Sequence, residues 1–496
     1  MMRVIGSLMA VALLLGAGSA PPRQESVYHE AFRRLHEAGQ FNGAVLIAVG
    51  DSVVLDAQFG TADVTTQRSL TDSSLYRLAS VSKVFTATAL LTLLEADRVA
   101  LDAPVQRYLP TFPYPAVTVR HLLQHSAGLP EYIFGVGDSR DDARGPMTNR
   151  DVLQWLIDTH PELAFPPGQG WDYCNTGFAL VPLIVEAVTG ESYPGYLRRA
   201  VFAPAGMHDS YHLAELGVTL RDRVAAGHGF DYATGVDVRV DRHPVLAAEF
   251  NTDSVFGAGD VVSTARDLFR FDQALKAGRI LSTSSQADAY TSLILPEGFP
   301  AGYGLGWQVA ESEYTGRIIH HHGQGDGYRT RYYRFLDRGI TIVTLQNARE
   351  RYADDAVRMA QQLAFKGTYT LPAHSLAEAL GGELHDHGLE AGLQLVDSAV
   401  AAPGSWAFDE RDLRNVALTY WFQGQREMAL ALFTSYLRLL PDEPGVYMSL
   451  AEALEEAGRT DEARTRYREA LEVARKDPRA HARQIATLKK LLGDGG

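Results

Sequence analysis

The distribution of apolar and polar positions along the chain predicts strands at both ends of the first 365 residues. "FNGAVLIAVGDSVVLDAQFGTAD" (41–63) has two apolar runs on either side of Gly50-Asp51, which indicates two strands joined by a tight turn. Strand character returns in "YGLGWQVAE" (303–311) and "GRIIHHHG" (316–323). Two further apolar runs flank Asp337-Arg338-Gly339, a sequence typical of a hairpin.

Helical patterns fill the region between these strands. "RLASVSKVFTATALLTLL" (77–94) is almost wholly apolar or small after Ser80, and we expect it to lie in a buried helix over 72–98. A mostly helical pattern continues from about 100 to 230, and its longest loop, 131–148, is long enough to be a lid or a site wall. The chain therefore predicts an α+β fold, in which both ends of the domain form an antiparallel sheet with flanking helices and an inserted helical subdomain.

After about residue 371 the pattern is purely helical, and two segments of it align at an offset of 34 residues. The aligned pairs are Ala417 with Ala451, Gly424 with Gly458, Ala429 with Ala463, Phe433 with Tyr467, and Leu437 with Leu471. This spacing resembles the tetratricopeptide repeat (TPR), in which small residues let paired helices approach. A degenerate earlier pair fits 374–400, with Gly388 near its turn. We expect a TPR-like domain over 371–493; the alternative is an ordinary helical bundle.

Composition and charge narrow the classes of partner. The 496 residues suffice for about two to four domains, and 46% of them are apolar, enough for a sizeable core. The formal net charge is -14 and no basic run is present, which argues against a nucleic-acid or anionic-membrane partner. Cys174 is the one cysteine, so no disulfide can form within the chain.

The N-terminus resembles a secretory signal peptide. A short basic start at Arg3 precedes the apolar stretch "VIGSLMAVALLLGAG", small residues end at Ala20, and the sequence then turns polar. We expect a signal peptide over 1–20 and an exported, periplasmic or secreted protein. No later stretch is long and apolar enough to be a transmembrane helix.

The apolar helix also carries a candidate catalytic pair, Ser80 and Lys83. Residues three apart share a helix face, and a partly desolvated ammonium can lose its proton and then activate a neighbouring hydroxyl. The alternatives are chance spacing and a lysine that extends to water from the helix start. Ser82 is a competing nucleophile, but it lies two positions on and points elsewhere.

Two later motifs extend the constellation. "WDYCNTGFAL" contains Tyr173-Cys174-Asn175, and "HHGQGDGYRT" contains His321-His322-Gly323. With Ser80-x-x-Lys83, and in this order, they resemble the serine β-lactamase and penicillin-binding protein family, most of all its class C and esterase branch. The segments 117–132, 257–271 and 303–307 each resemble a stretch of the same proteins. We therefore expect a β-lactamase-related hydrolase domain over 27–368.

The resemblance implies a role for each motif residue. Ser80 would be the acylated nucleophile, and Lys83 its base or base partner. Tyr173 would relay protons to the leaving group and later help to activate the deacylating water. Asn175 would orient Lys83 and the substrate amide. A second reading of Asn175 as a helix cap is compatible with this role.

The third motif implies a substrate-binding strand. Gly323 follows His321, and the backbone N–H groups of Ser80 and Gln324 would form the oxyanion hole. The β-lactamase pattern has a lysine at the position of His321, where its fixed charge holds a substrate carboxylate. Histidine is only partly protonated at neutral pH. This departure favours an esterase, or a peptidase acting on D-amino-acid substrates, over a dedicated β-lactamase.

For other polar residues near this motif, the sequence favours an ordinary structural role over a functional one. His320 and His322 share one strand face, but no third ligand at a matching spacing is obvious, so we expect no metal site. Arg329 and Arg331 could meet a substrate anion, although a solvated strand face is the preferred reading for both.

Together these features predict a secreted serine hydrolase that needs no cofactor. It would act through an acyl-enzyme on a small-molecule or peptide substrate: an ester, a D-amino-acid peptide or amide, or a β-lactam-like compound. The alternative is a catalytically idle scaffold whose TPR-like tail binds a protein or peptide partner. Partner binding, self-association and simple stabilisation of the hydrolase domain are all open for the tail.

Overall fold

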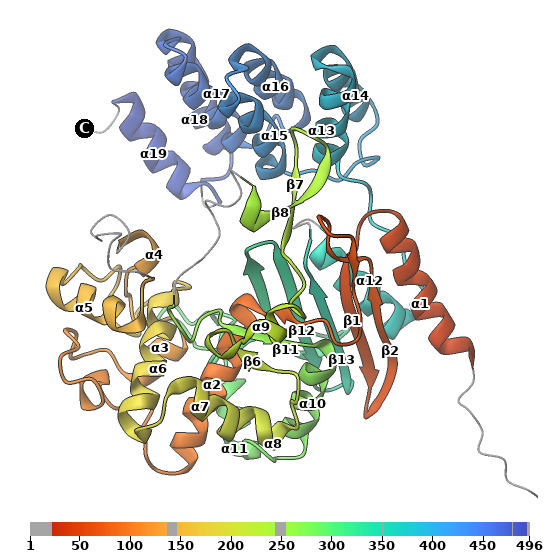
Figure 1. Cartoon of the computed structure of the whole chain (residues 1–496). Helices are drawn as coiled ribbons and strands as arrows, with labels where there is room; N and C mark the ends of the chain where they lie inside the picture. The colour runs from red at the N-terminus through yellow and green to blue at the C-terminus, as the bar shows by residue number, and fades with distance from the viewer. Residues whose placement is uncertain (1–21, 136–145, 244–253, 349–351, 479, 494–496) are drawn as a thin grey trace, which may run out of the picture.

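The computed structural model describes residues 22–135, 146–243, 254–348, 352–478 and 480–493 (Figure 1). The expected signal peptide lies outside these residues, as does the middle of the expected lid, 136–145. None of the helices described here is both long enough and apolar enough to cross a membrane.

A six-stranded antiparallel sheet forms the centre of the first domain, in the order β10-β11-β12-β13-β1-β2. Its strands come from both ends of the domain, as the apolar pattern predicts: β1 Gly43–Val49, β2 Ser52–Phe59, β10 Gln308–Ser312, β11 Gly316–Gly325, β12 Tyr328–Phe335 and β13 Ile340–Gln346. The predicted turns are present, with Gly50 and Gly339 at φ +60° and +62°. The α+β class and the two-ended sheet are therefore confirmed.

Each face of the sheet has its own hydrophobic core. On β1, Val45 and Ile47 pack toward α1 (Pro22–Glu37) and α12 (Ala353–Lys366). Ala44, Leu46 and Ala48 belong to the larger core on the opposite face, which is covered by helices. These helices include α2 Ser82–Glu95, α6 Asn175–Thr189 and α10 Ala265–Lys276.

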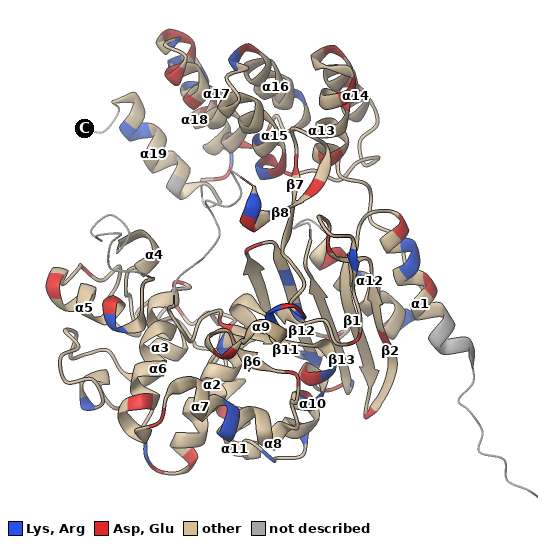
Figure 2. Cartoon of the chain, viewed as in Figure 1, with Lys and Arg blue, Asp and Glu red and all other residues tan. Residues whose placement is uncertain are grey.

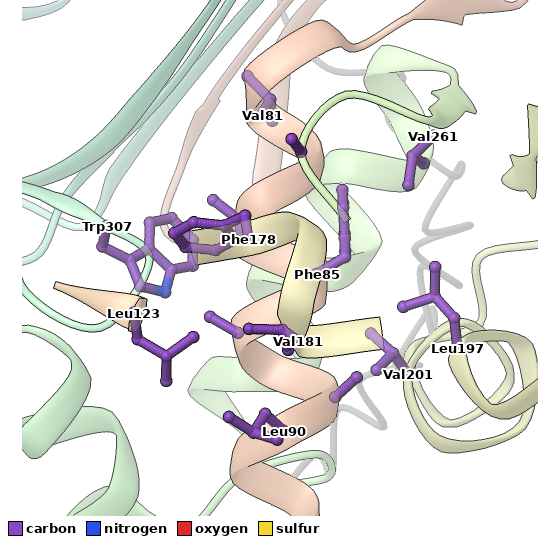
Figure 3. Close-up of a cluster of buried hydrophobic side chains, with 14 of the residues drawn as sticks. Val81, Phe85, Leu90, Leu123, Phe178, Val181, Leu197, Val201, Val261 and Trp307 are labelled. Carbon is purple, nitrogen blue, oxygen red and sulfur yellow. The ribbon is translucent and has the colours of Figure 1, made fainter. Parts of the chain in front are cut away.

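Helix α2 runs through the middle of the larger core, where Phe85 and Leu90 meet Phe178, Val181 and the side chains around them (Figure 3). Of its 14 residues, 11 are buried, which explains why the sequence is apolar on every side. The remaining helices of this layer are α3 Val119–Leu123, α4 Tyr132–Gly135, α5 Asn149–Thr159, α7 Tyr193–Leu197, α8 Ala203–Ala205, α9 Val218–Arg221 and α11 Thr283–Ala289, with a π-helical turn at Arg198–Phe202.

The helix predicted over 72–98 begins only at Ser82 in the structure, so its predicted start is wrong. Tyr76–Arg77 form strand β5, which pairs with β9 (Val261–Ser263), and a 3₁₀ turn at Ala79–Val81 precedes α2. Ala79 has φ +46°, a left-handed conformation that interrupts a right-handed α-helix. The backbone therefore turns sharply between the strand and the helix.

A β-hairpin at the end of the predicted helical region, and extending beyond it, was not expected from the sequence. It consists of β7 (His228–Asp231) and β8 (Val236–Arg239), and it projects from the sheet domain toward the tail (Figure 1). Gly235 closes its turn at φ +69°. Short strands with mixed polar residues carry little alternation, so the pattern did not reveal them.

The tail is all-helical, as predicted. It contains α13 Leu376–His387, α14 Leu389–Ala401, α15 Glu410–Phe422, α16 Arg426–Leu439, α17 Pro444–Glu456, α18 Thr460–Ala474 and α19 Ala482–Leu492. The matched residues Gly424 and Gly458 both end a helix in the left-handed conformation, at φ +80° and +78°. Acidic and basic residues are interspersed over both domains (Figure 2).

The hairpin joins the tail to the sheet domain. Tyr232, at its tip, packs on the hydrophobic core of the tail. A Cβ atom on Gly381 of α13 would lie 3.0 Å from the carbonyl oxygen of Tyr232, so the absence of a side chain lets the hairpin approach. A second contact lies nearer the linker, where the Gln40 side chain donates to the carbonyl of Pro372 at 3.1 Å.

Candidate active site

Ser80 lies in the 3₁₀ turn between β5 and α2. The preceding segment is held by Leu78, whose N–H donates to the Val261 carbonyl at 2.8 Å and whose carbonyl accepts from the Thr330 hydroxyl at 2.7 Å. The left-handed Ala79 then reverses the chain direction. Such backbone strain is common at functional sites. Ser80 is thereby presented at the start of α2, facing Lys83.

Ser82 has a structural role instead. Its hydroxyl accepts a hydrogen bond from the backbone N–H of Val261 at 3.0 Å, and the residue is fully buried. It holds α2 against β9, which agrees with the expectation that it points elsewhere.

Lys83 is fully buried and makes three hydrogen bonds. Its Nζ lies 3.1 Å from the Ser80 Oγ, 2.8 Å from the Asn175 Oδ1 and 2.9 Å from the Ala258 carbonyl oxygen. The last two atoms can only accept, so they bind two N–H groups of the amine. In the neutral amine the lone pair is then left for the Ser80 hydroxyl.

The environment of Lys83 favours this neutral form. Burial lowers the pKa of Lys83 to about 7, against the opposing effect of the Glu131 and Asp260 carboxylates. A large fraction of the amine is therefore unprotonated at neutral pH, which is the state that a general base needs. The alternative of a lysine that extends to water is excluded by its complete burial.

Asn175 opens α6 and turns its side chain toward Lys83. Cys174 is the cap residue of that helix, so the reading of Asn175 as the cap is wrong. The Asn175 backbone N–H and Nδ2 both donate to Oε2 of Glu131, at 2.7 and 3.0 Å.

Glu131 is the residue of this site that sequence reasoning missed. It is the last residue but one of the family-like segment 117–132, but nothing in its spacing connects it to Ser80 or Tyr173. Burial raises the pKa of Glu131, while its bonds to Asn175 and the charge of Lys83 oppose the rise. A carboxyl residue at the start of the expected lid, 131–148, was the only available signal.

Tyr173 lies beside the pair formed by Ser80 and Lys83. The Lys83 Nζ is 4.9 Å from the centroid of its ring, and the buried hydroxyl has no hydrogen-bond partner among the described residues. Burial raises the pKa of Tyr173 well above its usual range, although the nearby Ser80 hydroxyl opposes this. Tyr173 is therefore a neutral phenol, able to donate a proton.

His321 is buried behind the site rather than open to it. It is 1% exposed, with Nε2 2.9 Å from the Tyr303 hydroxyl and Nδ1 2.7 Å from the His322 carbonyl oxygen. Burial and the charge of Lys83 hold the pKa of His321 well below its usual range. The expectation of partial protonation at this position is therefore wrong. A protonated ring would be a buried cation, shielded from water and close to Lys83.

Gly323 brings β11 against the segment before Ser80. A Cβ atom at this position would lie 2.1 Å from the Leu78 carbonyl oxygen and 2.2 Å from the Thr330 Oγ1. Any side chain would push the strand away, so glycine is needed for the close approach. Gln324 follows on the same strand, opposite Arg329 of β12.

The neighbouring histidines and arginine belong to the opposite face. His320 stacks on Tyr333 at 4.7 Å between ring centroids, and the His322 Nε2 lies 2.6 Å from the Tyr333 hydroxyl. Arg331 is only 5% exposed and donates to Asp354 at 2.6 Å, so the prediction of a solvated strand face is wrong for it. The described part of the chain holds no cluster of three residues able to bind a metal.

Comparisons with known proteins match both parts of the chain. A family model described as "Beta-lactamase" matches residues 29–365, and a "Tetratricopeptide repeat" model matches residues 423–484. Penicillin-binding protein 4* of Bacillus subtilis (strain 168) is 35% identical over 344 residues, which are 69% of this chain and 76% of that protein. Esterase EstB of Burkholderia gladioli is 29% identical over 307 residues, which are 57% of this chain and 77% of that protein.

A solved structure has a fold similar to that of the first domain. D-amino acid amidase from Ochrobactrum anthropi SV3, complexed with L-phenylalanine amide, superposes with a TM-score of 0.58 at 26% sequence identity. The match covers 68% of this chain and 99% of the amidase.

Proposed function

Since this chain is a serine hydrolase that belongs to the β-lactamase family, we propose that it acts through an acyl-enzyme formed on Ser80. The observation that carries the proposal is the position of the Lys83 amine. It lies 3.1 Å from the Ser80 Oγ, and its pKa of about 7 makes it a competent base at neutral pH.

In the proposed reaction, neutral Lys83 takes the proton of the Ser80 hydroxyl as Oγ attacks the substrate carbonyl carbon. Negative charge develops on the carbonyl oxygen, which the backbone N–H groups of Ser80 and Gln324 would stabilise. The close approach of Gly323 to Leu78 supports this assignment. The leaving group departs with a proton from Tyr173, and Lys83 then returns a proton to Tyr173. Water then attacks the acyl carbon and gives up a proton to neutral Lys83. The bond between the acyl carbon and Oγ breaks, the acid product leaves, and Lys83 returns the proton to the Ser80 Oγ.

Esters and D-amino-acid amides or peptides are the proposed substrates. Dedicated β-lactamase activity requires a cation for the substrate carboxylate at the third motif, and the neutral, buried His321 does not supply one. The names of an esterase and a D-amino acid amidase among the similar proteins support the same classes. A β-lactam-like substrate is the less favoured member of the proposal.

We further propose that the protein is exported and that its tail binds a protein partner or a second copy of the chain. Export rests on the basic and apolar pattern of residues 1–20. Partner binding rests on the repeat match over 423–484. The contacts of Tyr232 and Gln40 support an additional role for the tail in stabilising the hydrolase domain.

A fluorophosphonate probe on the purified full-length chain tests the proposed chemistry. Wild type should become labelled on the peptide that contains Ser80, and S80A should remain unlabelled and lose ester hydrolysis by about three orders of magnitude or more. S82A is the matched control: it should be less stable, because the Val261 N–H loses its acceptor, yet it should still label. An unlabelled wild-type protein would instead support the catalytically idle scaffold.

A further inference from the structure

Two buried carboxylates lie behind the two carbonyl groups that accept hydrogen bonds from Lys83. The first is Glu131, which accepts from the Asn175 backbone N–H and from its Nδ2. A carboxylate can only accept, so it must face the NH₂ end of the Asn175 amide. The amide orientation is thereby fixed, and its oxygen is directed at the Lys83 Nζ, 2.8 Å away.

The second carboxylate is Asp260, which holds the turn around Ala258. Its Oδ1 accepts from the N–H groups of Gly257 and Gly259, at 2.6 and 3.2 Å, on either side of Ala258. The turn is tight, since Gly257 has φ +98°. Asp260 is 4% exposed, and this arrangement fixes the Ala258 carbonyl that Lys83 contacts.

A buried histidine supports Asp260 from the other side. The His212 Nε2 lies 2.6 Å from the Asp260 Oδ2, and its Nδ1 accepts from the Ala214 N–H at 3.0 Å. Because Nδ1 accepts, the ring proton is on Nε2 and faces the carboxylate. Both oxygens of Asp260 are therefore committed to fixed neighbours.

We propose that Glu131 and Asp260 are positioning residues that together aim the lone pair of neutral Lys83 at the Ser80 hydroxyl. This inference rests on the proposed function. The hydrogen bonds of Glu131 and Asp260 described above go to Asn175 and to the Ala258 turn, so both residues act through the lysine. With two N–H groups of the amine bound to fixed acceptors, only one direction remains for proton transfer.

The same two residues set the charge around Lys83. Glu131 and Asp260 raise its pKa, as does Cys174, whose own pKa is raised to about 11 by burial, so the thiol is neutral at pH 7. The other titratable groups around the amine are Tyr173, a neutral phenol, and His125 and His321, whose pKa values burial holds well below the usual range. Removal of one carboxylate charge should therefore lower the pKa of Lys83.

The test is the pH dependence of fluorophosphonate labelling at Ser80 in the full chain. E131Q keeps an oxygen that can accept both N–H bonds of Asn175 but loses the charge. D260N also loses the charge and keeps an oxygen for the N–H groups of Gly257 and Gly259, while its NH₂ group then lies against the His212 Nε2. In each, the acid limb of the labelling rate should move to lower pH by about half a unit or more. E131A loses orientation as well, so its rate at pH 8 should fall about tenfold or more, while E131Q stays within a few-fold of wild type.

Asp267 provides the matched control. It is a fully buried carboxylate that accepts from the Asp209 N–H and the Ser210 hydroxyl, away from the lysine. D267N should lower the melting temperature and leave the acid limb unchanged. Should D260N fail to fold, E131Q and E131A decide alone.

Two outcomes overturn the inference: an acid limb in E131Q and D260N that coincides with wild type, or an E131A protein that labels at the wild-type rate. Loss of the proposed function itself looks different, because wild type then carries no label on Ser80.

Discussion

The Tyr303 hydroxyl lies 2.9 Å from Nε2 of His321, whose Nδ1 lies 2.7 Å from the His322 carbonyl oxygen. A carbonyl only accepts, so Nδ1 carries the ring proton and Nε2 accepts from Tyr303. Both ring nitrogens are occupied, and the imidazole is held neutral in one tautomer.

A neutral His321 predicts how pH acts on substrate choice. Between pH 8 and pH 6, the ratio of kcat/KM for nitrocefin, which bears a carboxylate, to that for p-nitrophenyl acetate should stay constant within about twofold. Titration of Lys83 affects both substrates and cancels in the ratio. A ratio that rises several-fold by pH 6 would mean that His321 becomes protonated and binds the carboxylate.

Tyr173→Phe should slow amide substrates far more than activated esters. The neutral phenol donates a proton to the leaving group, which an amine requires and p-nitrophenolate does not. We expect a loss of about 10²–10⁴ in kcat for a D-amino-acid p-nitroanilide or amide and a much smaller loss for p-nitrophenyl acetate.

Tyr303→Phe is the matched control for that experiment, since it removes a buried hydroxyl from the same aromatic group. It should lower stability by about 1–3 kcal/mol, because Nε2 of His321 loses its donor. Its effect on the two substrates should be equal. Equal losses for the two substrates in the Tyr173 variant would exclude Tyr173 as the proton donor.

His320 and His322 should make the protein less stable as pH falls. Burial lowers their pKa values to about 3 and about 4, and the charge of Arg331 adds to the effect. Between the ordinary value of 6.5 and these values, the unfolded chain binds protons that the native state does not. The free energy of unfolding should therefore fall with pH from about 6.5 to 4, by up to about 1.4 kcal/mol per pH unit for each ring.

Urea unfolding at pH 7.5 and pH 5 measures this slope. H320Q/H322Q should show a smaller loss between the two pH values than wild type. H387Q, at a side chain that is 65% exposed on α13, should keep the wild-type slope. A double variant that is as pH-sensitive as wild type would assign the slope to other groups.

Gly381→Val should weaken the contact between the hairpin and the tail. A Cβ at Gly381 meets the backbone of Tyr232 at 3.0 Å, whereas a Cβ at the adjacent Gly382 meets nothing within 4 Å. G382V makes the same change in helix propensity, so it isolates the contact. We expect G381V to be less stable than G382V by about 1–3 kcal/mol, measured by thermal unfolding of the full chain. Identical melting curves would show that the hairpin does not bear on tail stability.

The core of the site is accessible from sequence because its geometry is largely local. Lys83 lies three positions after Ser80, so a helical turn places their side chains on the same face. The sheet is equally predictable, because central strands such as β1 and β13 are short, mostly apolar runs and its hairpins carry glycine at their turns. The position of Tyr173 and Asn175 beside them followed only from the family resemblance.

Other features depend on contacts between distant segments. Glu131 meets Asn175 across 44 positions, and no pattern within either segment indicates the pairing. The hydrogen bond of His321 goes to Tyr303, which lies in an irregular stretch before β10 rather than in the predicted strand. The hairpin of β7 and β8 is too short and too polar to produce a strand signal.

The hairpin constrains how this tail could be moved to another hydrolase. Its base is locked to the turn after β11, where a Cβ on Gly227 would lie 1.8 Å from the Asp326 carbonyl oxygen, and its tip is locked to α13. The repeats are thus not an independent domain that is connected to the hydrolase domain only by the linker after Lys366. A chimeric enzyme would therefore need residues 227–239 as well as the tail helices that they contact. These are two separate insertions in the sequence, and their surfaces meet only when the chain is folded.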